Sequence, residues 1–143
     1  MCWFIYGAVQ GNIDDEDLNN INSRHVCTLA KGTRHDVKMA VQSEFVDEKY
    51  HVTGKGCDCD SPIGEHNVND DLVQDLAHLL REVGELPGSD TISICKTWIG
   101  TRNKREIKLK LSDTDLVKLA ADFESSTLYT LSCRNSDSGK SKV

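Results

Sequence analysis

Residues 54–64 read Gly-Lys-Gly-Cys-Asp-Cys-Asp-Ser-Pro-Ile-Gly, and this stretch separates a strand pattern at residues 50–54 from the longest helical pattern, at residues 69–84. It holds two thiols, two carboxylates, three glycines and a proline. Because glycine adopts backbone conformations that residues with a Cβ disfavour, this composition predicts a loop shaped to aim side chains. The Cys57-Asp58-Cys59-Asp60 loop is therefore the candidate ligand site.

The helix that follows this loop carries the strongest periodic pattern in the chain. Its apolar residues recur at intervals of three and four, which places them on one face of a helix that ends near Gly84, before Pro87 and Gly88. These apolar residues are Leu72, Val73, Leu76, Leu79, Leu80 and Val83.

The rest of the chain alternates between strand and helix patterns. An apolar run at residues 2–9 predicts a central strand, and alternation at 92–94 and 107–111 predicts the two arms of a hairpin. The other expected elements are helices at 13–22 and 116–123 and strands at 25–30, 37–41 and 127–133. Strands interrupted by about three helices predict an α+β two-layer sandwich, with the helices packed on a mostly antiparallel or mixed sheet.

Length and charge narrow the class of protein. A chain of 143 residues matches the commonest size of one domain, so we expect a single domain at residues 1–133 and a flexible polar tail at 134–143. The formal net charge of −6 disfavours bulk attraction to nucleic acid or to an anionic membrane. No apolar run reaches the roughly 18 residues of a membrane span, and the first residues lack the basic start of a signal peptide. We therefore expect a cytoplasmic protein without a membrane partner.

Cysteine usage fits that expectation. In a reducing compartment, thiols are more often buried apolar residues, metal ligands or nucleophiles than halves of disulfides. Four of the six cysteines fall in expected strands, where a buried thiol behaves as a small hydrophobe. The six are Cys2, Cys27, Cys57, Cys59, Cys95 and Cys133, and only Cys57 and Cys59 lie in an expected loop.

A zinc site is one hypothesis for this loop. Zinc is bound by four nitrogen or sulfur ligands at about 2.0 to 2.3 Å, and two thiolates separated by one residue converge only where the backbone curls. The predicted ligands are Cys57, Cys59, His51 and His66, with Cys27 or Cys95 as substitutes brought in by folding. The alternative is a structural pair of cysteines, because no second Cys pair with zinc spacing is present.

Two other chemistries of the loop are disfavoured. Asp58 and Asp60 do not fit the EF-hand template, which requires an oxygen ligand and a glycine where this chain has Pro62 and Ile63. We expect solvated loop carboxylates instead, or a role of Asp60 in turning the chain before Pro62. A redox couple needs a thiol of low pKa, and two adjacent carboxylates raise a thiol pKa more than the neighbouring lysine lowers it.

The amino terminus offers a second thiol. Removal of Met1 would leave Cys2 with both a thiol and a free α-amino group, whose pKa of about 8 suits it as a base. With Ile5 and Gly7, Cys2 resembles the start of the class II glutamine amidotransferases, N-terminal-nucleophile enzymes whose mature chains begin with cysteine on a strand. The resemblance implies a thiol-dependent enzyme with Cys2 as its catalytic nucleophile. Trp3 replaces the glycine usual in that family, and the family's downstream motifs are absent, so a buried Cys2 is preferred.

The leading functional hypothesis is a small cytosolic binding or accessory domain, because no complete catalytic motif is present. The alternative is a thiol-dependent enzyme using Cys2 or the Cys57/Cys59 pair. Between residues 96 and 111, six basic side chains oppose Glu106 alone, a local balance of +5 that could meet an acidic partner or a phosphate-bearing ligand. Alternating lysines also keep a sheet edge soluble, which is the preferred interpretation. Homodimerisation through this edge stays open.

Overall fold

The computed structural model describes residues 3–42, 48–54, 58–98 and 102–133. The predicted tail at 134–143 and two of the candidate thiols, Cys2 and Cys57, lie outside the described residues. The elements in chain order are β1 (Trp3–Gly11), α1 (Asp15–Asn22), β2 (Ala30–Lys31), α2 (Arg34–Gln42), the 3-10 helix η1 (Glu48–Tyr50), α3 (Asp71–Gly84), β3 (Ser89–Trp98), β4 (Arg105–Lys110), the 3-10 helix η2 (Leu111–Asp113), α4 (Leu116–Ala121) and β5 (Thr127–Ser132).

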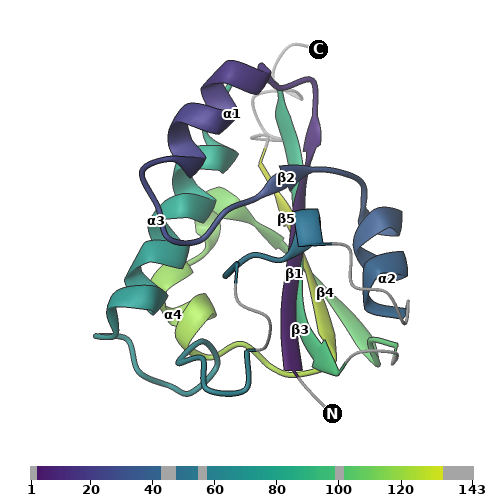
Figure 1. Ribbon diagram of the computed structural model, residues 1–143, viewed down its shortest axis with the longest axis vertical. Coiled ribbons are helices and arrows are strands. Elements are labelled where there is room, and N and C mark those ends of the chain that lie inside the picture. The colour runs from purple at the N-terminus through teal and green to yellow at the C-terminus, as the bar shows by residue number, and fades with distance from the viewer. Residues whose placement is uncertain (1–2, 43–47, 55–57, 99–101, 134–143) are drawn as a thin grey trace.

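A five-stranded mixed sheet organises the protein. Its strand order is β2-β1-β3-β5-β4, with antiparallel pairing of β3 to β1 and β5 and parallel pairing of β2 to β1 and of β4 to β5. Figure 1 shows α1, α3 and α4 along one face of the sheet and α2 against the other. The predicted α+β class, with a mixed sheet and a layer of three helices, is confirmed.

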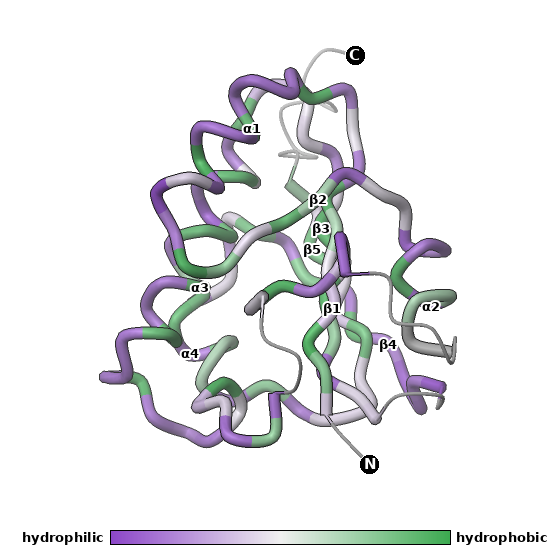
Figure 2. Tube along the Cα trace, viewed as in Figure 1, coloured by the Kyte–Doolittle hydropathy of each residue, from purple (hydrophilic) through white to green (hydrophobic). Residues whose placement is uncertain are grey.

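Two apolar clusters lie on opposite faces of this sheet. Successive side chains of a strand point to opposite faces, so β1 contributes Ile5 and Val9 to the larger cluster and Phe4 and Tyr6 to the smaller one. The larger cluster also contains the inward side chains of α1, α3 and α4. Figure 2 shows the consequence, with hydrophobic residues along the strands and hydrophilic ones on the outer turns of the helices. No helix in the described ranges is long and apolar enough to cross a membrane.

The predicted strand at 37–41 is wrong, because this segment belongs to α2. Thr33 and Asp36 explain the helix. The Thr33 main-chain nitrogen donates to the Asp36 carboxylate at 2.7 Å, and the Asp36 nitrogen donates to the Thr33 hydroxyl at 3.1 Å. This reciprocal cap starts a helix, and Val37 and Ala40, three residues apart, then face the smaller cluster.

The predicted hairpin of β3 and β4 is also wrong. β5 lies between these two strands and pairs with both of them. The chain leaves β4, passes through α4 and returns as β5 parallel to β4, which makes a strand-helix-strand unit. Alternation in the sequence therefore identified both strands but not their partner.

The expected strands at 25–30 and 50–54 are mostly irregular. Only Ala30 and Lys31 form a strand, and His51 makes a single bridge to Tyr6 of β1. The two segments contact each other through the Thr28 nitrogen, which donates to the Val52 carbonyl at 2.8 Å. Side-chain hydrogen bonds, and not a regular ladder of main-chain bonds, fix the two segments.

Candidate functional site

Asp58, in the middle of the predicted site, is completely buried. One carboxylate oxygen accepts a hydrogen bond of 2.8 Å from the Ile5 main-chain nitrogen and lies 2.9 Å from Nε2 of His51. The other oxygen accepts a hydrogen bond from the Thr53 hydroxyl. The expectation of a solvated carboxylate is therefore wrong for Asp58, whereas Asp60 is exposed as expected.

Asp58 and its neighbours cover the start of β1 on the side away from β3, where the short β2 does not reach. The Val52 nitrogen donates to the Ile5 carbonyl at 2.9 Å, and the Asp58 nitrogen donates to the Trp3 carbonyl at 2.8 Å. Together with the Asp58 carboxylate, they satisfy groups of β1 that a neighbouring strand would otherwise bind. The residues on either side of the Cys-Asp-Cys motif thus close a sheet edge.

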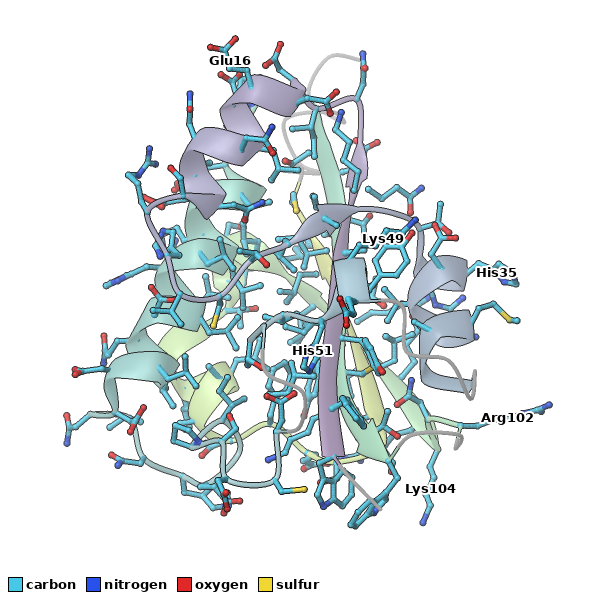
Figure 3. The ribbon with its side chains drawn as sticks, viewed as in Figure 1. Glu16, His35, Lys49, His51, Arg102 and Lys104 are labelled. Carbon is cyan, nitrogen blue, oxygen red and sulfur yellow. The ribbon has the colours of Figure 1, made fainter. Side chains whose placement is uncertain are left out.

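His51 is held tightly in this arrangement. Its side chain is 6% exposed, and its ring lies 5.5 Å from the Phe4 ring and 5.9 Å from the Tyr6 ring, between centroids. Figure 3 shows His51 close against β1. A histidine oriented by a carboxylate is a part of many catalytic and metal sites. Here the same carboxylate also binds the backbone of β1, which gives the pair a structural role.

The predicted metal ligands do not all share one environment. Nδ1 of His66 lies 2.8 Å from the Asp122 carboxylate, and the His66 side chain is 75% exposed. Cys59 is exposed, and Cys57 lies outside the described residues. Among the residues that the structure describes, no three histidine, cysteine or acidic side chains are grouped so that they could hold a metal ion. The zinc site at Cys57, Cys59, His51 and His66 stays a prediction.

Two of the other described cysteines, Cys95 and Cys133, are not activated. None of the four described cysteines is in a disulfide. Burial raises the pKa of the Cys95 thiol to about 12 and that of the Cys133 thiol to about 11, so both are protonated near neutral pH. Cys27 is buried as well. The nucleophile predicted at Cys2 lies outside the described residues and stays a prediction.

A partly buried ion cluster around His25 was not predicted from the sequence. Nδ1 of His25 lies 2.9 Å from Asp75, and Nε2 lies 2.5 Å from Glu82. Asp75 also accepts hydrogen bonds from the main-chain nitrogens of Val26 and Cys27. Burial lowers the pKa of His25, but the hydrogen bonds and charges of the two carboxylates outweigh it and raise the pKa overall. The cluster fixes the loop after α1 to α3.

The basic segment forms the opposite edge of the sheet, on β4. Lys108 and Lys110 are exposed, and by the two-residue period of a strand they share one face with Glu106. Glu106 pairs with Arg34 of α2 and accepts a hydrogen bond from Thr130 at 2.8 Å. Figure 3 shows Arg102 and Lys104, just before β4, pointing away from the body of the protein.

A cleft that the sequence did not predict lies beside the end of β4. Its cavity volume is about 540 Å³, and it opens between the end of α3 and the carboxyl ends of β4 and β5. Residues from three separate segments line this cleft, so no local motif in the sequence indicates it. The lining residues include Arg81, Glu85, Leu86, Leu111, Ser112 and Cys133.

Comparison of the chain with protein-family models, curated proteins and solved structures found no match.

Proposed function

We propose that this protein is a binding domain that takes up an acidic, extended peptide segment as an additional strand on the edge of β4. The observation that carries the proposal is the difference between the two sheet edges. At one edge of the sheet, β2 is only two residues long and pairs with Ala8 and Val9, and the first residues of β1 beyond it are closed by Val52 and Asp58. At the other edge, the six-residue β4 ends the strand order with no strand of the described ranges on its outer side. An open edge offers main-chain donors and acceptors to an incoming strand.

The charge of this edge selects the partner. Lys108 and Lys110 lie two residues apart and are exposed on the same face of β4. Carboxylates at alternate positions of an added strand would lie opposite them, and each such cross-strand pair contributes about 0.2 to 1 kcal/mol. Arg102 and Lys104 extend the basic surface beyond the start of β4. The rest of the protein is acidic, so the basic character is local.

A second copy of this chain is a poor partner for the same edge. Pairing of two β4 strands would bring the lysines of both copies onto one small surface, and like charges placed opposite each other destabilise a strand pair. An acidic partner has no such penalty. We therefore propose an acidic segment, and not a second copy of the chain, as the partner. A cytosolic setting suits the four described cysteines, none of which is in a disulfide.

A peptide-binding experiment tests the proposal. The probe is a fluorescein-labelled peptide in which Glu and Val alternate over about eight residues, enough to span a typical strand. Fluorescence anisotropy should show binding that weakens as salt is added, because salt screens exposed charges. The Lys108→Glu/Lys110→Glu variant should bind about tenfold more weakly, which corresponds to about 1.4 kcal/mol. The matched control Lys31→Glu/Lys118→Glu makes the same charge change elsewhere and should bind as the parent protein does.

A second peptide separates strand addition from charge attraction alone. The same sequence with N-methyl groups at alternate residues keeps every carboxylate but loses main-chain donors. It should bind much more weakly than the parent peptide if it pairs with β4. Equal binding of the methylated peptide, or unchanged binding by the Lys108→Glu/Lys110→Glu variant, would refute the proposal and leave the lysines as protection of the edge.

A further inference from the structure

The cleft beside α3 lies where two parallel strands end. β4 and β5 run in the same direction, with Lys110 opposite Ser132, and the cleft opens just beyond these residues. Parallel strands commonly carry ligand sites beyond their carboxyl ends, because the loops that follow them diverge there. A volume of about 540 Å³ lies within the range of small-molecule sites. This place in the fold is separate from the outward-facing lysines of β4.

Two opposite charges line the cleft from α3. Arg81 lies in the last turn of the helix and Glu85 is its C-cap, four residues later, so both side chains lie on one side of the helix end. Both are exposed, and neither forms a salt bridge with a side chain in the described ranges. Basic-before-acidic is the weaker order for pairing at this spacing. Among the described residues, the guanidinium and the carboxylate therefore both have no charged partner and can bind a ligand.

The cleft also has apolar lining. Leu86, Leu111 and Cys133 contribute it, and the raised pKa of Cys133 keeps that thiol neutral. Gly84 fixes the position of Leu111, because a Cβ at Gly84 would come within 2.2 Å of a Leu111 methyl carbon. The end of α3 and the residue that follows β4 therefore pack closely together beside the cleft.

We infer that this cleft binds a small zwitterion with an apolar side chain, such as a free amino acid. Arg81 would bind its carboxylate, Glu85 would bind its ammonium group, and the apolar lining would cover its side chain. A ligand with only one charge would leave one of the two side chains without a partner. The Ser112 hydroxyl at the rim adds a neutral hydrogen-bonding group. This inference does not depend on the peptide proposed for β4.

Three related probes test the inference by nuclear magnetic resonance of the ¹⁵N-labelled protein. L-leucine keeps both charges, leucine amide lacks the carboxylate, and N-acetylleucine lacks the ammonium group. At up to about 10 mM, which detects a dissociation constant near 1 mM, leucine should shift the amide signals of Glu85, Leu86, Ser89 and Ser112. Each blocked compound should need several times the concentration for the same shift.

Two variants show which side chain binds which charged group of the ligand. In Arg81→Gln, leucine and leucine amide should bind equally, because the partner of the carboxylate is gone. In Glu85→Gln, leucine and N-acetylleucine should bind equally. Lys118→Gln, on exposed α4 outside the cleft lining, is the matched control and should keep the parent preference. The dispersion of the amide signals reports that each variant is folded. Equal shifts with all three probes in the parent protein, shifts only outside the cleft, or no shifts would overturn the inference.

Discussion

The main-chain nitrogen of Ile5 donates a hydrogen bond of 2.8 Å to the carboxylate of Asp58, which lies 53 positions later in the sequence. A side chain here takes the place of a neighbouring strand's carbonyl group. The start of β1, which the short β2 does not reach, is therefore closed by residues of the same chain, while β4 ends the sheet on the other side. The difference between the edges is what directs the functional proposal to β4.

Replacement of Asp58 should strongly destabilise the fold. Asp58→Ala leaves the buried Ile5 nitrogen and the His51 ring without their acceptor, and a buried unpaired group costs about 1 to 3 kcal/mol. We expect a loss of about 3 kcal/mol in the free energy of unfolding, measured with urea. Asp60→Ala, at the exposed neighbouring carboxylate, should change it by less than about 0.5 kcal/mol. Similar losses in the two variants would contradict the structural role of Asp58.

The His25 cluster should make stability depend on pH. The pKa of His25 is raised in the folded protein, so its contribution is fully present below about pH 6.5, its value in the unfolded chain, and is lost as pH rises through the folded pKa. The pKa of Glu82 is lowered, mainly by its hydrogen bond to His25, so its contribution is present above about pH 4.5 and is lost as pH falls through the folded pKa. The cluster should therefore stabilise most near pH 5 to 6.

Urea unfolding at several pH values measures this effect. His25→Gln should lower the free energy of unfolding near pH 6 by about 1 kcal/mol, a modest value because Glu82 is partly exposed, and should flatten the decline toward pH 8. His66→Gln removes a histidine whose ion pair with Asp122 is far more exposed, so its pH profile should match that of the parent protein. A parent profile that is flat between pH 6 and 8 would show that the cluster is unimportant.

Alkylation with iodoacetamide should distinguish the cysteines. Cys59 is exposed and should react first among the described cysteines, because the reagent can reach its thiol. Cys95 and Cys133 should react much more slowly, because burial raises their pKa values to about 12 and 11. Peptide mass spectrometry after timed labelling near pH 8 gives each rate. Cys133 labelling as fast as Cys59 would be the contrary result, and unusually fast labelling of Cys2 would favour the enzyme hypothesis.

Two glycines with similar backbone angles should differ in their tolerance of a side chain. Gly54 and Gly88 have φ values of +69° and +90°, so alanine costs about 1 to 2 kcal/mol of backbone strain at either one. At Gly88 the added Cβ would also lie 2.1 Å from the Asn12 carbonyl oxygen, whereas at Gly54 no atom of the described residues lies within 4 Å of it. Thermal unfolding should therefore show a clearly larger loss for Gly88→Ala than for Gly54→Ala. Equal losses would mean that the turn at Gly88 moves freely.

Local periodicity in the sequence was enough for several elements. The spacing of apolar residues placed α3 correctly, and the same reasoning found α1, α4, β1 and β5. It failed for α2, where alternation and helical spacing coincide at Val37, Ala40 and Val41 and the Thr33–Asp36 cap decides for the helix. The fold class could be predicted from these elements, because their number and type leave few ways to bury their apolar faces.

The sequence by itself determined which residues are apolar, and hence which faces of the helices and strands turn inward. Only the tertiary structure decided which elements meet: β5 separates β3 from β4, His25 reaches two carboxylates on α3, and Asp58 is buried against β1. A carboxylate in a glycine-rich loop is normally solvated, and it becomes buried only when donors from distant segments converge on it. Periodicity indicates on which face of its own helix or strand a residue lies. A hydrogen bond between residues 53 positions apart depends instead on how distant segments pack together.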